Sequence, residues 1–359
     1  MPEGEQRKIM NSVLEKEISE LVNNTSYAER LQNKTILITG ANGLLARYLS
    51  YYLLMCNKIK DSNIRVILLA RSKEKTINNF SYFDSDKNLS YLFQDVCEKI
   101  NYDGKIDYIF HAASNASAHA IRNNPVDIIK SNLIGTFNVL ELAKEVNATK
   151  VVFPSTREIY GKVTNLDVIH EEDMGTLDPM DERNCYPESK RMAEAIFKSY
   201  SKQFQIPFNI LRIAHTYGPC MPLANDGRVM SDLINFAINE EDIILNSDGT
   251  ALRSFCYVSD AILGILSVIC NGEINEVYNL SNTKESVSIR DLAQKIAANV
   301  PYDIKVGFKE ASPEVLKGYT SYKIVNMDNS KLEALGWNPS ITLDEGLKRT
   351  IQYFLEEKN

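Results

Sequence analysis

Residues 34–46 constrain the fold of this 359-residue chain more than any other stretch. Residues 35–38 are apolar and rich in β-branched side chains, which predicts a short buried strand. Small residues follow at Gly40, Gly43 and Ala46, and a helical pattern of apolar residues comes next. The first glycine permits a tight turn, the second lets the backbone approach a pyrophosphate, and Ala46 lets the helix pack on the strand. Because the helix N-terminus faces the negative charge, the stretch predicts a dinucleotide-binding site.

Strand-like and helical patterns alternate along the next part of the chain. Apolar runs predict strands at residues 63–70, 92–96, 106–111 and 151–156, and a helix is predicted at residues 125–146. Alternation at this spacing predicts an α/β fold with a Rossmann-type, doubly wound parallel sheet. Ligands of such sheets bind beyond the carboxyl ends of the strands, which is where the informative residues of this chain fall.

The chain is long enough to hold a second, smaller unit. We expect residues 34–213 to form the dinucleotide-binding Rossmann domain. Residues 214–359 are expected to form mainly a C-terminal α/β substrate-binding domain, with some segments returning to the Rossmann domain. Residues 1–33 predict a helical extension, because apolar residues recur there on one face of a helix. The pattern leaves open whether this helix packs on the body, packs on a second subunit or belongs to a mobile leader.

Composition argues against several classes of partner. The net charge is −7 and the sequence has no long basic run, which argues against nucleic-acid binding. No apolar stretch approaches the roughly 20 residues that a membrane span requires, and the N-terminus lacks the apolar core of a signal peptide. The cysteines are scattered without metal-binding pairs, so we expect no metal site and reduced thiols in a cytoplasmic protein. They are Cys56, Cys97, Cys185, Cys220, Cys256 and Cys270.

The end of the second predicted strand bears on the choice of nicotinamide cofactor. A carboxylate there would bind the ribose 2′-hydroxyl of NAD, but this chain has Ala70 followed by Arg71. Arg71 can accept the 2′-phosphate of NADP, stack on the adenine of NAD, or be a solvated side chain at a strand end. Asp95 can accept a hydrogen bond from the adenine amine or be an exposed loop residue. The residues themselves do not decide between NAD and NADP.

Three residues suggest the chemistry. Thr156 ends the fifth predicted strand, and Tyr186 and Lys190 lie one turn apart on one face of a predicted helix. A free tyrosine, with a pKa of about 10, is a poor base at neutral pH, and a lysine ammonium one turn away favours the phenolate. A threonine hydroxyl can hold the substrate oxygen beside it. The set suits removal of a proton from a sugar or alcohol hydroxyl while hydride leaves the same carbon for a nicotinamide.

The motifs together resemble the extended short-chain dehydrogenase/reductases, and specifically the NAD-dependent epimerase/dehydratase family acting on nucleotide sugars. The resemblance runs from about residue 34 to the C-terminus. It is carried by Thr39-Gly-x-x-Gly-x-x-Ala46, His111-Ala-Ala-Ser114, Asn132, Ser155-Thr-x-Glu-Ile-Tyr-Gly161, Tyr186-x-x-x-Lys190 and Tyr217-Gly-Pro219. The family likeness implies a homodimer formed through two long helices, at about residues 125–146 and 186–204.

The resemblance also assigns expected roles to residues. It implies that Thr156, Tyr186 and Lys190 are catalytic, with Glu158 near the sugar ring, and that NAD is the cofactor, NADP being possible because of Arg71. The expected cofactor-binding residues are Gly40, Asn42, Gly43, Leu44, Arg71, Asp95, Val96, Ala112, Ala113, Ser114, Asn132 and Lys190, with Asn132 also in a proton-relay core. The expected substrate-binding residues are Ser117, Arg157, His215, Arg228 and Arg253.

Within the family the nearest likeness is to UDP-glucuronate decarboxylases, with three departures. Arg157 stands where decarboxylases have serine and 4,6-dehydratases have an aspartic acid, so ordinary 4,6-dehydration is not expected. His215 replaces an asparagine that contacts the sugar nucleotide, and Arg71 replaces the segment with the ribose-binding acid. A guanidinium at Arg157 can clamp a substrate carboxylate or phosphate, or it can pair with Glu158 or Glu172.

The predicted reaction is transient oxidation at C4 of a nucleotide sugar, with decarboxylation of a uronate as the specific expectation. A 4-epimerase and an NADPH-dependent 4-ketosugar reductase are the alternatives, because all three reactions use the same triad. A non-catalytic dinucleotide-binding protein on the same fold is a fourth possibility. It would have little reason to keep Thr156, Tyr186 and Lys190 together.

Overall fold

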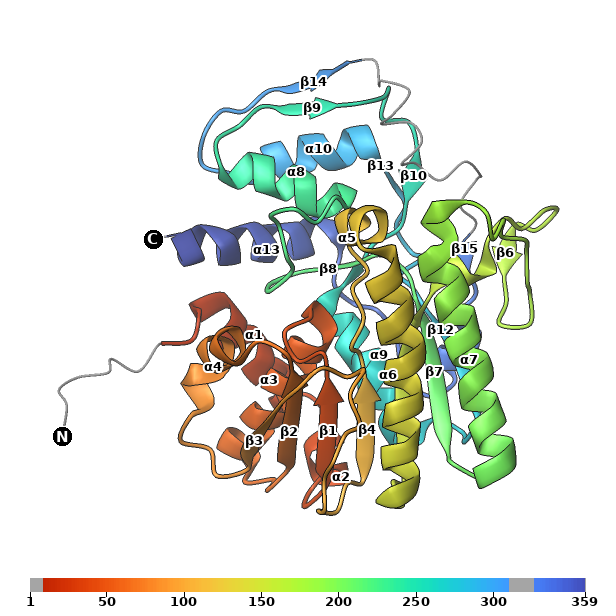
Figure 1. The fold of residues 1–359 in the computed structure, drawn as a ribbon. Helices are drawn as coiled ribbons and strands as arrows, with labels where there is room; N and C mark the ends of the chain where they lie inside the picture. Colours follow the sequence, from red (N-terminus) through yellow and green to blue (C-terminus); the bar gives the residue numbers. More distant parts are fainter. Residues whose placement is uncertain (1–8, 310–325, 359) are drawn as a thin grey trace.

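A computed structural model describes residues 9–309 and 326–358 of the chain (Figure 1). Its centre is a seven-stranded sheet in the order β12-β7-β5-β4-β1-β2-β3, in which every neighbouring pair is parallel. This confirms the predicted Rossmann-type α/β fold. The strands are β1 (Thr35–Thr39), β2 (Arg65–Ala70), β3 (Leu89–Phe93), β4 (Tyr108–His111), β5 (Lys150–Thr156), β7 (Phe208–Ile213) and β12 (Glu276–Leu280).

Helices cover both faces of this sheet, so the inner strands are buried on both sides. Ile36 and Ile38 of β1 pack in one core cluster with α3 (Leu44–Lys60) and α9 (Val258–Asn271). Leu37, between them, packs in another cluster with α6 (Pro125–Glu145) and α7 (Cys185–Phe204). The alternation along one strand therefore supplies the two cores on which the helices pack.

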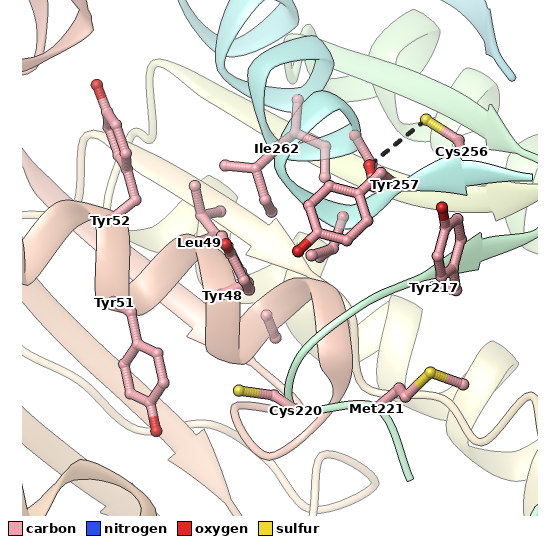
Figure 2. Packing of buried hydrophobic residues seen from close by; sticks show 14 of the residues in the cluster. Tyr48, Leu49, Tyr51, Tyr52, Tyr217, Cys220, Met221, Cys256, Tyr257 and Ile262 are labelled. Carbon is pink, nitrogen blue, oxygen red and sulfur yellow. Dashed lines mark hydrogen bonds between the residues drawn. The ribbon is translucent and has the colours of Figure 1, made fainter. Parts of the chain in front are cut away.

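Tyrosines make up much of the core around α3. Figure 2 shows Tyr48 and Leu49 of α3 directed toward Tyr257 and Ile262 at the start of α9. Tyr48 and Tyr52 are fully buried, and the Tyr52 hydroxyl lies 2.8 Å from the Thr25 hydroxyl. These aromatic side chains fill the space between the N-terminal segment and the sheet.

The third strand differs from the prediction at its end. Residues 92–96 were expected to be strand, whereas β3 ends at Phe93. Asp95 turns the chain instead, because its carboxylate accepts a hydrogen bond from the backbone N–H of Cys97 at 2.8 Å. Asp95 and Val96 therefore lie in the loop that follows the strand.

The helix α1 (Ser12–Asn23) packs on the body of the same chain, against α3 and α13 (Leu343–Lys358). The side chain of Asn11 accepts hydrogen bonds from the first turn of α1 and donates to the carbonyl of Tyr353 at 3.2 Å. Glu17 is buried, and its carboxylate accepts a hydrogen bond from the Tyr257 hydroxyl at 2.9 Å.

A smaller unit lies beyond the carboxyl edge of the sheet, in the upper part of Figure 1. Its helices are α5 (Ala118–Asn123), α8 (Val229–Ile238), α10 (Ile289–Ala297) and part of α13. Its short strands pair as β9 (Ile243–Leu245) with β14 (Val306–Phe308), and β10 (Leu252–Arg253) with β13 (Val287–Ser288). Between β10 and β13 the chain returns to the central sheet through α9 and β12, the latter beside β7.

The remaining α-helices and strands are short. They are α2 (Tyr27–Arg30), α4 (Lys73–Phe80), α12 (Ser330–Glu333), β6 (Val168–Ile169) paired with β15 (Asn326–Met327), and β8 (Thr216–Tyr217) paired with β11 (Cys256–Tyr257). Among the described residues, no helix is both long enough and apolar enough to cross a membrane.

Candidate active site at the carboxyl edge of the sheet

The turn after β1 passes unusually close to the end of β4. Gly40 has a φ of +68°, and a Cβ atom there would lie 2.7 Å from the carbonyl oxygen of Ala112 and from the Cα of Ala113. Gly43 caps α3 without a side-chain hydrogen bond, so the N–H groups of the first helical turn are left for another acceptor. Leu44 is the first residue of that helix. This bare turn fits a pyrophosphate, because it offers backbone donors and no side chain to block them.

An ion pair lies at the end of the site where we expect adenine to bind. The Arg71 guanidinium lies 3.6 Å from the Asp95 carboxylate, and 76% of the Arg71 side chain is exposed. Burial opposes ionisation of Asp95, yet hydrogen bonding from Cys97 and the charge of Arg71 bring its pKa below the usual value. Val96, next in the chain, is buried beneath Gly135.

Two other expected cofactor residues, Asn42 and Ser114, differ in whether their side chains have hydrogen-bond partners within the protein. The side-chain amide of Asn42 donates to the Thr76 hydroxyl at 2.8 Å and accepts from Asn79 at 2.7 Å, so it joins the glycine turn to α4. Ser114, which follows Ala112 and Ala113 after β4, has a buried hydroxyl with no hydrogen-bond partner. That unpaired hydroxyl fits a site completed by a ligand.

The structure brings Thr156 and Tyr186 together at the end of β5. Thr156 ends the strand, and Tyr186 lies in the first turn of α7 with 7% of its surface exposed. Burial raises the pKa of the Tyr186 phenol, and the nearby Glu158 carboxylate raises it further. A hydrogen bond with Thr156 and the charge of Arg228 act in the opposite direction.

Lys190 does not lower the pKa of Tyr186 in the way that we predicted. Its ammonium donates to the backbone carbonyl of Pro154 at 2.9 Å and lies 4.2 Å from the centre of the Phe153 ring. Burial lowers the pKa of Lys190 to about 7, while the Glu194 carboxylate acts to raise it. The prediction of a depressed tyrosine pKa is therefore wrong for the protein without ligands, because desolvation of the phenol outweighs the nearby positive charges.

Asn132 links the two long helices beneath the tyrosine. Its side-chain N–H donates to the Ser189 hydroxyl at 2.9 Å, and that hydroxyl donates to the carbonyl of Tyr186 at 2.9 Å. The side-chain oxygen of Asn132 is buried without a hydrogen-bond partner. Asn132 thus holds α6 to the first turn of α7 and keeps one acceptor available.

Sequence reasoning overlooked the role of His111, which it treated only as part of a motif. The His111 ring lies between the hydroxyls of Thr39, at 2.9 Å, and Thr136, at 3.2 Å. Burial, together with the charge of Lys190, lowers its pKa to about 3, so the ring is neutral. It joins β1, β4 and α6 under the site.

The charges of three arginines act on His215, in the segment that follows β7. Burial lowers the pKa of His215 to about 3, and the charges of Arg157, Arg253 and Arg228 lower it as well. Its Nε2 atom is buried without a hydrogen-bond partner. Three guanidinium groups from separate segments therefore act electrostatically on one neutral ring, and one of them, Arg228, also acts on Tyr186, which suits an anionic ligand.

The contacts of these arginines differ. Arg228 makes a bidentate ion pair with the buried Asp226 carboxylate, at 2.6 and 3.0 Å. Arg253 donates to the carbonyl of Leu252 at 2.8 Å, and burial followed by the charge of Arg157 lowers its pKa. Arg157 itself is buried in the turn that follows β5.

The two other predicted site residues, Glu158 and Ser117, each interact with another group of the protein. The Glu158 carboxylate lies 3.8 Å from the Arg183 guanidinium, so this glutamate faces an arginine that the sequence did not single out. The Ser117 hydroxyl accepts a hydrogen bond from the N–H of Ala120 at 3.1 Å and caps α5.

Comparison with known proteins identifies the family. The model of the NAD dependent epimerase/dehydratase family matches residues 36–281, more than half of the chain. UDP-glucuronic acid decarboxylase 1 of Xenopus tropicalis is 32% identical over 351 residues, covering 98% of this chain and 78% of that protein. UDP-glucuronic acid decarboxylase 6 of Arabidopsis thaliana is 32% identical over 318 residues, covering 88% of this chain and 87% of that protein.

Solved structures of similar fold include two epimerases. UDP-glucose 4-epimerase of Thermotoga maritima superposes with a TM-score of 0.77 at 22% identity, covering 90% of this chain and all of that chain (100%). UDP-glucuronic acid 4-epimerase of Bacillus cereus, solved with NAD, superposes with a TM-score of 0.72 at 23% identity, covering 90% of this chain and 96% of that chain. The family match and the decarboxylase relatives agree with the resemblance stated from the motifs, and the solved structures agree with the fold. The chain belongs to the NAD-dependent epimerase/dehydratase family of nucleotide-sugar-modifying enzymes.

Proposed function

We propose that this enzyme decarboxylates a nucleotide-linked glucuronate, with UDP-glucuronate as the leading substrate, through transient oxidation at C4. The observation that carries the proposal is that the charges of Arg157, Arg253 and Arg228 all lower the pKa of His215, and that Arg228 also lowers the pKa of Tyr186. A diphosphate and a sugar carboxylate together carry more negative charge than one arginine balances. The 32% identity to UDP-glucuronic acid decarboxylases, over most of the chain, supports the same substrate class.

In the proposed mechanism Tyr186 acts on the 4-hydroxyl of the sugar. Its oxygen takes the hydroxyl proton, while the Thr156 hydroxyl holds the sugar oxygen in place. When bound, NAD supplies the hydride acceptor for C4 and later returns the hydride to it. The 4-keto sugar then accepts the electron pair of the C5–C6 bond as the carboxylate leaves as CO₂, and a proton is added at C5. We assign Arg157 to holding that carboxylate before it leaves, and Arg228 and Arg253 to the diphosphate.

The cofactor-binding roles follow the geometry of the glycine turn. We assign the pyrophosphate to the backbone at Gly40, Gly43 and the start of α3. We assign the adenine end to the Arg71–Asp95 pair. A carboxylate 3.6 Å from Arg71 would repel a 2′-phosphate, so this pair supports NAD over NADP.

The decisive experiment identifies the cofactor carried by the purified protein and then supplies UDP-, GDP-, CDP- and dTDP-linked sugars. We expect UDP-glucuronate to release one CO₂ for each UDP-pentose formed, measured by trapped CO₂ and by NMR of the product. UDP-glucose is the matched control, because it lacks only the carboxylate. Inversion at C4 without CO₂ would replace the proposal with an epimerase, and consumption of NADPH with a 4-ketosugar would replace it with a reductase.

We also propose a homodimer formed through the outer faces of α6 and α7. Apolar side chains lie exposed on both helices, including Val126 at 59%, Phe137 at 44% and Met192 at 53%. A second copy would cover these side chains. We further infer a reducing, cytoplasmic setting, because all six cysteines are free thiols.

A further inference from the structure

A buried ion pair joins α7, the helix that contains Lys190, to the strand β7. The Glu194 carboxylate lies 2.8 Å from the Arg212 guanidinium and accepts a hydrogen bond from the Ser155 hydroxyl at 2.5 Å. Only 12% of the Glu194 side chain and 5% of the Arg212 side chain are exposed. Arg212 also donates to the Tyr160 hydroxyl at 3.1 Å and to the carbonyl of Glu171 at 2.6 Å.

This pair connects the catalytic helix to two strands of the sheet. Ser155 and Arg212 are register partners on β5 and β7, and Glu194 comes from α7. Lys190 and Glu194 lie four residues apart, so they share one face of α7 one turn apart. The contacts of Glu194 therefore set the position of the helical turn that holds the lysine.

The groups that face Lys190 come from several elements. Neutral His111 lies on β4, the Phe153 ring and the Pro154 carbonyl lie on β5, and Tyr186 and Glu194 lie on α7 itself. Lys190 is 98% buried, since only 2% of its surface is exposed. A buried ammonium with neutral neighbours loses its proton unless an anion balances it.

We propose that Glu194 is a positioning residue for Lys190, keeping the lysine protonated and its ammonium aimed at the active-site end of β5. The inference rests on the proposed function only in assuming that a protonated Lys190 serves the Tyr186 chemistry. The Glu194 charge raises the pKa of Lys190 against the effect of burial, in agreement with the geometry. Arg212 in turn keeps the glutamate ionised and fixed between the two strands.

The test measures the protonation of Lys190 directly, in the full chain carrying its NAD. Protein labelled with ¹³C at the lysine ε-carbon is titrated by NMR, and the Lys190 signal is assigned by its loss in Lys190→Met. In Glu194→Gln we expect the midpoint of the Lys190 titration to fall by about one pH unit. Glu194→Asp keeps the negative charge, so we expect its Lys190 titration midpoint to lie close to that of the wild type.

The matched control is Glu188→Gln, on the same helix, which removes a half-exposed carboxylate whose arginine partner is 3.8 Å away. It should leave the Lys190 titration unchanged. Glu194→Gln leaves Arg212 buried without its partner, so the double variant Glu194→Gln/Arg212→Met is tested beside it; because it removes both charges, it should show a smaller fall than Glu194→Gln. An unchanged Lys190 titration in folded Glu194→Gln would overturn the inference.

The proposal for Glu194 and the proposed decarboxylase activity can be disproved independently of each other. Lys190 titrates whether or not UDP-glucuronate is a substrate, so absence of CO₂ release does not affect this test. If the wild-type enzyme does release CO₂, the alkaline limb of its pH–rate profile should move to lower pH in Glu194→Gln. A uniform loss of rate with an unmoved profile would show that Glu194 only supports the fold, and would contradict the proposal.

Discussion

At the scale of single residues, burial shifts the pKa values of the site tyrosine and lysine in opposite directions. Burial raises the pKa of Tyr186, and burial lowers the pKa of Lys190 to about 7. Both shifts arise because a closed, water-poor site disfavours a charged group of either sign. Both groups therefore favour their neutral forms, so Tyr186 requires nearby positive charge if it is to act as a base.

The phenol oxygen of Tyr186 should be required for the chemical step. In Tyr186→Phe we expect kcat to fall by about 10²–10⁴-fold, because the variant keeps the ring but loses the proton acceptor. The NAD content of the purified variant should equal that of the wild type. Tyr82→Phe, the same substitution at a partly exposed site, is the control. Retention of full kcat in Tyr186→Phe would assign the proton transfer to another group.

Arg157 should discriminate between acidic and neutral sugars. In Arg157→Ser we expect KM for UDP-glucuronate to rise about tenfold or more, because a charged hydrogen-bond donor to the carboxylate is lost. Binding of UDP-glucose, measured by calorimetry, should change much less. Arg122→Ser, which removes an exposed arginine of α5, serves as the control. Equal losses for both sugars would place Arg157 near the diphosphate instead.

At the scale of elements, the helix α1 is attached to the body through a buried carboxylate. The Glu17 carboxylate accepts a hydrogen bond from Tyr257 at 2.9 Å and lies 3.7 Å from Arg349 of α13. Burial raises the pKa of Glu17 above its ordinary 4.5, although Tyr257 and Arg349 lower it in part. The N-terminal helix therefore contributes a titrating group to the junction between α1, β11 and α13.

This junction makes stability depend on pH with a definite sign. Because the folded-state pKa of Glu17 is raised, the folded protein binds the proton more tightly, and stability is lost as pH rises from about 4.5 through the raised value. Glu17→Gln stays neutral and keeps an acceptor for Tyr257. We expect its Tm relative to the wild type to increase with pH across that window, measured by calorimetry. A Tm difference independent of pH would show that Glu17 does not titrate there.

At the scale of the whole molecule, the site exists because parallel strands end at one edge. The turn after β1, the end of β5 and the start of α7 meet there, and the segment with His215 follows β7, the strand next to β5. The long helices α6 and α7 pack on each other beside this edge, as Figure 1 shows. A dimer through their outer faces would support Tyr186 and Asn132 from behind.

The dimer proposal can be tested at Phe137, an exposed aromatic residue of α6. A charge placed in a desolvated apolar interface should weaken association by about 30-fold or more in Phe137→Glu. Analytical ultracentrifugation across a range of protein concentrations measures the shift toward monomer. Ile59→Glu, at a 38% exposed position on α3, is the matched control and should leave association unchanged. If the wild-type protein sediments as a monomer, the dimer proposal is wrong.

The sequence by itself determined the features that depend on neighbours along the chain. The strand–turn–helix at Gly40 and the one-turn spacing of Tyr186 and Lys190 follow from backbone geometry, so both could be read from residue patterns. Tertiary structure alone decided that Arg71 meets Asp95, that Glu194 pairs with Arg212, and that the Tyr186 pKa is raised. These depend on distances across the fold and on loss of water, because electrostatic energies in a buried site are set by whichever groups folding brings together.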